Sequence, residues 1–255
     1  MTMCNWCGGV AAQNFQCSQI RSTTTADSCS SNIGWSLAPD QHKGNTLKIA
    51  IIGASRGIGF ELLNIALEEG HEVTTLMRNP AKLNVSNSRL KVMAGDILDT
   101  ASVAAVISGQ DAVCVCIGIP PTRKPVDVFS RGIVCVLAAM GRESHQKLVV
   151  VTGIGTGDSK GHGGFLYDRV INPLLLGKIY ADKERQESII KASDAEWLIV
   201  RPGFLTNGPR TRKYRTIENL SGVTAGKISR RDVADFILKQ LTAPTCFGRT
   251  PLLTY

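Results

Sequence analysis

Short apolar runs alternate with amphipathic segments from about residue 47 to the end of the chain. The apolar runs predict strands at 47–53, 72–77, 90–93, 111–118, 147–152, 197–201 and 251–254. Helical periodicity predicts helices at 57–69, 101–108, 126–140, 183–192 and 231–241, with Gly70 ending the first helix and Ser229 capping the last. Nearly continuous apolar runs are typical of parallel strands that are covered on both faces.

This alternation predicts an α/β fold, a doubly wound parallel sheet of the Rossmann type, in a single domain at 47–255. Repeated strand–helix units with right-handed crossovers place helices on both faces of such a sheet. A ligand then binds outside the carboxyl ends of the strands, where the strand order reverses.

Residues 1–46 show no helical or strand period and are rich in Ser, Thr, Asn, Gln and Gly. Their only charged side chains are Arg21, Asp27, Asp40 and Lys43. Such a composition buries too little apolar surface to offset chain entropy, which predicts a disordered tail. A Ser/Thr-rich, acid-poor leader with few arginines is also typical of a plastid transit peptide, which would deliver the domain to the stroma. If the tail is an untargeted extension instead, the protein is expected in the cytoplasm.

The composition is that of an ordinary globular protein, with 43% hydrophobic and 20% charged residues. No apolar run reaches the roughly 18 residues that a membrane span requires, so a soluble domain is expected. The net charge of +8 comes from basic residues scattered among acids, apart from one cluster of Arg210, Arg212, Lys213 and Arg215. Because aromatic residues make up only 5% of the chain, this cluster is interpreted as a rim that attracts an anionic cofactor or substrate, not a nucleic acid.

The eight cysteines fall into a tail group and a domain group. Cys4 and Cys7 have the spacing of half a zinc site, but no second pair follows, so no metal is expected. Cys114 and Cys116 lie in an apolar strand and are expected to behave as small buried hydrophobes.

A glycine-rich loop, Gly53-Ala54-Ser55-Arg56-Gly57-Ile58-Gly59, directly follows the first predicted strand and opens the first predicted helix. Glycine permits a tight turn and a close approach to a pyrophosphate, and the helix N-terminus offers free N–H groups to the phosphates. The spacing differs from G-x-G-x-x-G, but the strand before the loop and the helix after it favour a dinucleotide site. The predicted cofactor contacts in this loop are Gly53, Ser55, Arg56, Gly57 and Ile58.

The end of the second predicted strand carries Arg78 where an NAD site would carry an acid. An acid binds the ribose 2′-hydroxyl of NAD, whereas an arginine pairs with the 2′-phosphate of NADP. Lys82 follows soon after, and Arg56 lies in the glycine loop at the same end of the sheet. The pattern therefore predicts NADP(H) in preference to NAD(H).

The same loop also has the G-x-S-x-G spacing of a hydrolase nucleophile elbow, with Ser55 as the nucleophile. An elbow needs several strands before it, and an acid and a histidine after it. Ser55 follows the first strand, and only His145 and His162 are placed to serve as a base. A hydrolase is therefore the less favoured alternative.

Further motifs follow the glycine loop at 76–80 (LMRNP), 95–99 (GDILD), 111–113 (DAV), 151–155 (VTGIG), 180–183 (YADK), 201–203 (RPG) and 228–234 (ISRRDVA). With them, the chain from about residue 48 onward resembles the atypical short-chain dehydrogenase/reductases, in the NAD(P)H-binding branch of biliverdin reductase B and flavin reductase type. The resemblance implies that Asp96 and Ile97 flank the adenine and that Ile117 and Gly118 line the dinucleotide. It also implies that Thr152 and Gly153 border the nicotinamide, with Pro202 to Leu205 closing over it. A turn-capping role is the alternative for Asp96.

The catalytic residues of the larger branch of this superfamily are only partly present. That branch uses a serine and a Tyr-x-x-x-Lys pair. Here Gly153 takes the serine position, and Tyr180 and Lys183 are one residue too close, which rotates a helical tyrosine by about 100°. Lys183 is the candidate that holds the nicotinamide ribose, and Tyr180 is the candidate general acid. His162, in a glycine-rich loop, is expected to be solvated.

The predicted function is an NADPH-dependent oxidoreductase that transfers hydride to a small planar or carbonyl-containing acceptor, such as a flavin, a quinone or a tetrapyrrole-like molecule. Positioning a hydride donor against a flat, electron-poor ring does not require a strong proton donor. The missing serine and the displaced Tyr180 favour a second hypothesis, a non-catalytic NADP(H)-binding redox sensor or assembly factor.

Overall fold

The central sheet has eight strands in the order β3-β2-β1-β4-β5-β6-β10-β8. This computed structural model describes residues 46–141, 145–164, 169 and 176–255. The strands of the sheet are β1 Lys48–Ile52, β2 Glu72–Met77, β3 Leu90–Ala94, β4 Ala112–Val115, β5 Lys147–Val151, β6 Glu196–Pro202, β8 Arg215–Ile217 and β10 Leu252–Thr254. Neighbouring strands are parallel except β10 and β8, which are antiparallel. The predicted doubly wound, Rossmann-type sheet is confirmed.

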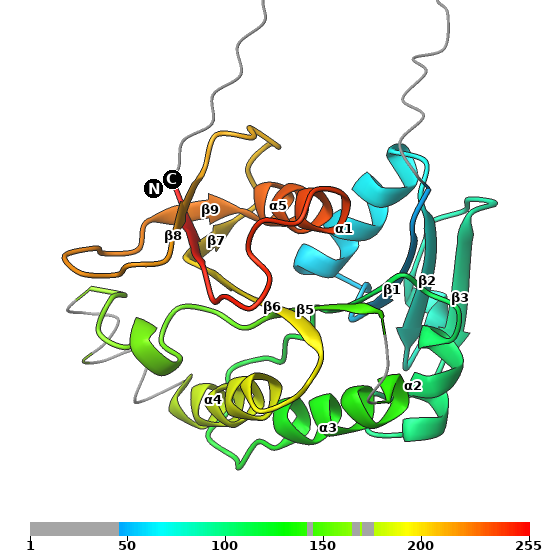
Figure 1. The fold of residues 1–255 in the computed structure, drawn as a ribbon, viewed down its shortest axis with the longest axis horizontal. Coiled ribbons are helices and arrows are strands. Elements are labelled where there is room, and N and C mark those ends of the chain that lie inside the picture. The colour runs from blue at the N-terminus through cyan, green and yellow to red at the C-terminus, as the bar shows by residue number, and fades with distance from the viewer. Residues whose placement is uncertain (1–45, 142–144, 165–168, 170–175) are drawn as a thin grey trace, which may run out of the picture. The chain divides into compact units, whose positions relative to one another are not determined.

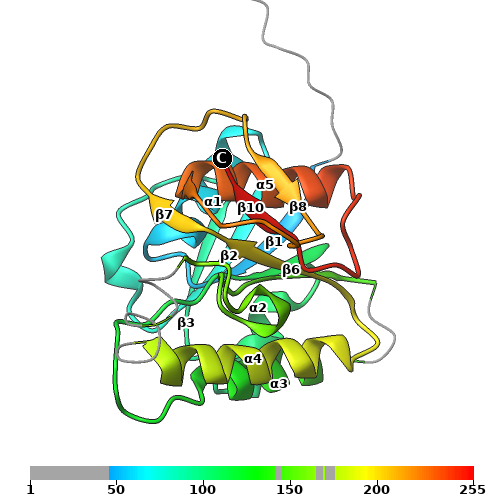
Figure 2. The same cartoon turned by 90° about the vertical axis from the view of Figure 1, so that its left-hand side faces the viewer.

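The helices of the described residues cover both faces of this sheet. They are α1 Gly57–Glu68, α2 Thr100–Ile107, α3 Val128–Met140, α4 Gly177–Lys191 and α5 Arg230–Thr242. The pair α1 and α5 lies on one face, and α2, α3 and α4 lie on the other (Figures 1 and 2). Side chains of β1 alternate between the two layers: Ile49 and Ile51 pack with α1 and α5, whereas Ala50 and Ile52 pack with α2 and α3. All four are at most 2% exposed, which explains the continuous apolar pattern of this strand.

The strand order reverses between β1 and β4, which pair in parallel. The predicted strand at 111–118 ends early, at Val115, because the chain leaves the sheet there and passes close to the glycine loop. A Cβ atom at Gly53 would lie 2.8 Å from the carbonyl oxygen of Cys116. This crevice between two diverging connections is where doubly wound sheets bind ligands.

Three short strands were not predicted. β7 Phe204–Thr206 and β9 Lys227–Ser229 pair in parallel outside the main sheet, and β8 pairs with β10. Each has only three residues, too few for an alternating pattern to show. The helix predicted from residue 183 begins earlier, at Gly177. The prediction starts too late because polar side chains on the buried face, such as Asp182 and Glu187, hide the helical period.

Ser229 caps α5 as predicted: its Oγ accepts a hydrogen bond of 3.0 Å from the backbone N–H of Asp232. The predicted tail, with Cys4 and Cys7, lies outside the described residues apart from Thr46. Within the described part of the chain, no helix is both long and apolar enough to cross a membrane.

Candidate functional site

A cavity of about 920 Å³ opens at the carboxyl ends of the strands, at the crevice between β1 and β4. Its walls come from the glycine loop, the ends of β2 and β4, and residues of β5, α4, β6 and β7. Of the cofactor contacts predicted from the sequence, Gly153, Gly203 and Phe204 do not line it, and the others do: Gly53, Ser55, Arg56, Gly57, Ile58, Arg78, Asp96, Ile97, Ile117, Gly118, Thr152, Pro202 and Leu205. The fold therefore brings residues as far apart in the chain as Gly53 and Leu205 to one cavity.

The glycine loop has no room for side chains at two of its glycines. Gly53 has a φ of +100°, which favours glycine, and a Cβ there would also meet the backbone of Cys116. A Cβ at Gly59 would collide with the carbonyl oxygen of Gly53 and lie 3.0 Å from the Cβ of Cys116. The first turn of α1 is thereby held tightly against the end of β1, with its N-terminus at the cavity.

Among the described residues, no side chain is hydrogen-bonded as a cap to the N-terminus of α1. Arg56 is the N-cap residue, its backbone is extended, and its side chain makes no capping hydrogen bond. The first N–H groups of a helix lack intrahelical partners and carry the positive end of the helix dipole. An anion at this end of the cavity would satisfy them.

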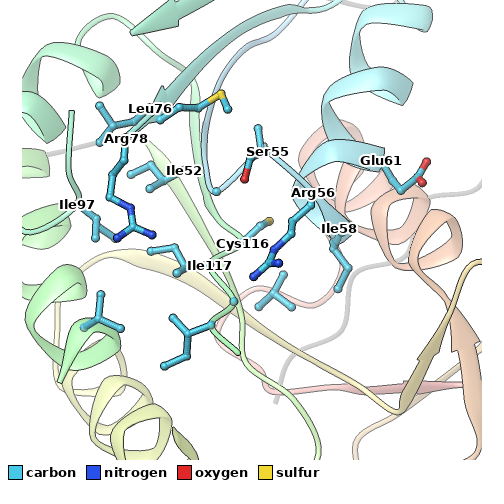
Figure 3. A pocket seen from close by; sticks show the side chains of 18 of the residues that line it. Ile52, Ser55, Arg56, Ile58, Glu61, Leu76, Arg78, Ile97, Cys116 and Ile117 are labelled. Carbon is cyan, nitrogen blue, oxygen red and sulfur yellow. The ribbon is translucent and has the colours of Figure 1, made fainter. Parts of the chain in front are cut away.

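Basic side chains surround this open helix end. Figure 3 shows Arg78, from the end of β2, and Arg56, from the glycine loop, both pointing into the cavity. Within the described residues, neither these two arginines nor Lys82, which also lines the cavity, has a carboxylate partner. The cationic charge at this end is therefore free to bind a ligand.

Asp96 both lines the cavity and caps a turn. Its Oδ1 accepts a hydrogen bond of 3.0 Å from the backbone N–H of Leu98, which is the turn-capping role weighed for it. The neighbouring Ile97 is buried among the side chains of α2 and α3. The turn thus fixes where both residues border the cavity.

Lys183 lines the opposite end of the cavity. Its Nζ donates a hydrogen bond to the carbonyl oxygen of Thr152 and lies 5.2 Å from the centre of the Phe129 ring. Burial lowers the pKa of Lys183 to about 8, although the negative charge of Glu187 acts in the opposite direction. A lysine with this pKa changes its charge near neutral pH, which suits it to exchange a proton or to hold a hydroxyl group.

A buried ion-pair network centred on Glu187 and Arg201 contacts Thr152 and acts electrostatically on Lys183. Arg201, which is fully buried, donates from Nε and from a terminal nitrogen to Glu187, at 3.1 and 2.6 Å, and also pairs with Asp158. Glu187 Oε1 accepts from the hydroxyls of Thr152 and Thr156 at 2.7 and 2.6 Å. Burial opposes the ionisation of Glu187, but the hydrogen bonds and charge of Arg201 outweigh it and lower the pKa of this carboxyl.

Sequence reasoning missed the network. Two signals were present: an arginine closing an otherwise apolar strand at 197–201, and Glu187 four residues after Lys183, on the same face of a helix. Buried charges of this kind are rarely found unless they are paired.

Tyr180 lies beside Gly153 and is not among the residues that line the cavity. A Cβ at Gly153 would be 3.3 Å from the Tyr180 hydroxyl, so the missing side chain at 153 makes space for the tyrosine ring. Lys183, three residues further along α4, does line the cavity. The short Tyr-x-x-Lys spacing thus brings only the lysine to the cavity wall.

His162 is held by its loop and does not line the cavity. Its Nδ1 lies 2.7 Å from the carbonyl oxygen of Val223, and its own carbonyl accepts from the N–H of Ala225 at 2.8 Å. His162, expected to be solvated, is partly exposed, and these contacts fix its orientation in the loop. In the described part of the chain, no histidine is hydrogen-bonded to Ser55, so the hydrolase alternative gains no support from the geometry.

The basic cluster expected to form a rim lies elsewhere. Arg210 pairs with Asp235 and with Glu69, both at 2.6 Å, and Arg212 also pairs with Asp235. Arg215 donates to the carbonyl oxygen of Tyr255 at 2.8 Å. These contacts tie the segment after β7 to α1 and α5, so the prediction of a rim formed by this cluster is wrong.

Cys116 also lines the cavity, whereas Cys114 is fully buried in β4, as expected. Burial raises the pKa of the Cys116 thiol to about 12, so it stays protonated at neutral pH. Within the described residues, no group of three or more His, Cys, Asp and Glu side chains is arranged to hold a metal ion.

A family model described as NAD(P)H-binding matches residues 53–244, from the glycine loop to the end of α5. An uncharacterised chloroplastic protein of Arabidopsis thaliana is 28% identical over 211 residues, which are 77% of this chain and 72% of that protein. The oxidoreductase ptaF of Pestalotiopsis fici is 29% identical over 176 residues, which are 62% of this chain and 67% of that protein. Among solved structures, the anaerobilin reductase ChuY of Escherichia coli O157:H7 has a TM-score of 0.69 and 23% identity, and the similarity covers 81% of this chain and 96% of that one.

Proposed function

The chain belongs to this NAD(P)H-binding family, and from that premise we propose that it is an NADPH-dependent reductase of a small planar or carbonyl-containing acceptor. The observation that carries the proposal is a cavity that joins a cationic, glycine-lined end to a part lined by Lys183 and by apolar side chains such as Val128 and Leu205. When bound, NADPH supplies a hydride, and the acceptor takes up that hydride and one proton while NADP⁺ is formed.

The residues present fit this cofactor. The pyrophosphate would bind at the uncapped N-terminus of α1, where the crowded Gly53 and Gly59 let the backbone approach it closely. The adenine would lie beside Asp96 and Ile97, and the nicotinamide near Thr152, Lys183 and Pro202. In this arrangement Lys183 holds the nicotinamide ribose, and Tyr180 acts as a proton donor only if its ring moves into the cavity.

The preference for NADPH over NADH is proposed from Arg78, which points into the cavity from the end of β2 (Figure 3). We expect Arg78→Ala to weaken NADPH binding by about tenfold, because a charge-assisted contact to the 2′-phosphate contributes roughly 1.5 kcal/mol. NADH binding is expected to change little. Cofactor fluorescence titrations with both nucleotides measure the two effects.

Lys91→Ala is the matched control for Arg78→Ala, because Lys91 is an exposed cation on the neighbouring strand β3 and does not line the cavity. It should leave both affinities unchanged. Equal losses of NADPH and NADH affinity in Arg78→Ala would contradict the NADP preference.

The affinity for NADPH should depend on pH through Lys183. Below about pH 8 this amine is protonated and donates strong hydrogen bonds, and above about pH 8 it is neutral. We therefore expect the Kd for NADPH to rise by roughly fivefold to tenfold as the pH passes upward through this value, since hydrogen bonds from charged donors are stronger by about 1 kcal/mol. Lys183→Arg, which stays charged, should give a flat profile over the same range. A wild-type Kd that does not vary would refute this role.

A second function, a non-catalytic NADP(H)-binding sensor or assembly factor, is favoured by the position of Tyr180 outside the cavity wall. NADPH oxidation by the purified protein, followed by loss of reduced-nicotinamide absorbance with a panel of flavins, quinones and biliverdins, separates the two. Turnover supports the reductase. Tight NADPH binding without turnover of any acceptor supports the sensor.

We propose that residues 1–46 direct the protein to the plastid stroma. The support is the Ser/Thr-rich, acid-poor composition of this segment, together with the chloroplastic relative from Arabidopsis thaliana. Isolated chloroplasts should import and shorten the full chain but leave a chain that starts at Leu47 outside. If the chloroplasts import neither form, the result favours a cytoplasmic location.

A further inference from the structure

Two consecutive arginines at the start of α5 have different surroundings. Arg231 donates from Nε to Glu61 Oε2 at 3.1 Å and is thereby neutralised. Arg230 lines the cavity, is only partly exposed, and has no carboxylate partner in the described part of the chain. One of its terminal nitrogens donates to the neutral amide oxygen of Asn207 at 2.7 Å. The cavity wall therefore contains a guanidinium whose charge nothing in the described structure balances.

The β7–β9 pair sets Arg230 beside Asn207, and Arg230, from α5, and Lys183, from α4, reach the cavity from opposite faces of the sheet (Figure 1). Leu205 is opposite Ile228 and Thr206 is opposite Ser229, so Asn207 and Arg230 leave the two strands side by side. Leu205, Asn207 and Arg230 all line the cavity, as do Thr152 and Lys183. If the nicotinamide lies near Thr152 and Lys183, as proposed above, the wall that holds Arg230 borders the space left in the cavity for the second substrate.

We infer that the acceptor carries an anionic group, a carboxylate or a phosphate on a side arm, and that Arg230 binds this group and determines which acceptors are reduced. The inference rests on the proposed reductase function. Asn207 fixes one edge of the guanidinium, which leaves its other N–H groups for a bidentate contact to an anion. Leu205 lines the cavity and is 37% exposed, so it offers an apolar face to a flat ring. Partial burial strengthens the charged contact, since fewer water molecules compete for it.

The test compares acceptors that differ only in their anionic group: FMN with riboflavin for a phosphate, and biliverdin with its dimethyl ester for carboxylates. The full-length protein should show a kcat/KM for the anionic member of at least one pair about tenfold above that for its neutral partner. Arg230→Gln should bring the ratio within about threefold of unity by lowering only the anionic acceptor's value, and the KM for NADPH should not change. The pair that responds identifies the source of the anion.

Arg231→Gln is the matched control, because it removes a neighbouring positive charge that is already paired with Glu61. It should keep the preference for the anionic acceptor. Arg230→Lys, which retains the charge but not the bidentate geometry, should retain part of it. Circular dichroism of each variant identifies any loss of fold before the ratios are compared.

Two kinetic results would overturn the inference. Equal kcat/KM values for both members of both pairs in the wild-type protein would show that no anion is selected. A higher KM for NADPH in Arg230→Gln, with the acceptor ratio unchanged, would assign Arg230 to the cofactor instead. If no acceptor is turned over, the reductase proposal fails, and quenching of FMN and riboflavin fluorescence by the NADP⁺-loaded protein still tests the anion site. Equal affinities there would then refute it.

Discussion

Replacing Arg201 by methionine is expected to lower the free energy of unfolding by about 3–5 kcal/mol, the cost of leaving one partner of a buried ion pair alone. The side chain is fully buried, and among the described residues Glu187 would keep the hydroxyls of Thr152 and Thr156 and the more distant amine of Lys191, at 3.8 Å. Urea denaturation followed by circular dichroism measures the change. NADPH affinity should also fall, because the same network orients Thr152 against the amine of Lys183.

Arg249→Met is the matched control, since Arg249 pairs with Glu218 on the surface: one of its terminal nitrogens donates to both carboxylate oxygens, at 2.7 and 2.8 Å. Its side chain is 55% exposed, so water screens the pair and little stability should be lost. Adding Glu187→Gln to Arg201→Met should recover part of the loss, because no unpaired charge then remains buried. An unfolding free energy of Arg201→Met within about 1 kcal/mol of wild type would contradict the importance assigned to the network.

Gly59→Ala is expected to weaken NADPH binding by about tenfold to a hundredfold. The added methyl group meets backbone, which cannot rotate away: it collides with the carbonyl oxygen of Gly53 and approaches Cys116. Overpacking of this kind costs about 1–3 kcal/mol, occasionally more, and here the strain falls on the loop proposed to bind the pyrophosphate. Fluorescence titration gives the Kd, and a thermal melt reports how much of the loss is global unfolding.

Gly208→Ala controls for the general cost of replacing a glycine. A Cβ there would meet only side-chain atoms of Ser229 and Thr206, at 3.5 and 3.6 Å, which are ordinary contact distances. This variant should bind NADPH as the wild type does. Unchanged binding in Gly59→Ala would mean that the loop relaxes and that its close packing is not needed for the cofactor.

The sheet and one end of the cavity could be predicted because their signals are local. The buried strand β1 reads directly as an apolar run, and the glycine loop follows it without interruption. Arg78 was recognisable because the register of β2 places its end beside that loop. Each of these inferences needs only a short stretch of sequence and the rules of a parallel sheet.

The other end of the cavity depends on contacts between distant residues. Arg201 meets Asp158, 43 positions away, and Arg210 meets Glu69, 141 positions away. No local pattern in the sequence indicates such pairs. For this reason the buried network was not predicted, and the basic cluster was wrongly predicted to form a rim of the anion site. The N-terminal turns of α4 were missed for a related reason, because the helix buries Asp182 and Glu187 where a hydrophobic stripe would normally mark it.

The place of β10 in the sheet determines the order in which the domain is completed during synthesis. This strand follows every other strand of the described residues, yet it pairs with β6 on one side and β8 on the other. On the ribosome, β1 to β5 can associate early, while the free edge of β6 waits for β10 to emerge and needs protection from other chains. The glycine loop thus emerges long before the sheet beside the proposed acceptor wall is complete. NADPH that binds late-folding chains would draw them toward the native state, so cellular cofactor supply is expected to influence the yield of this protein as well as its activity.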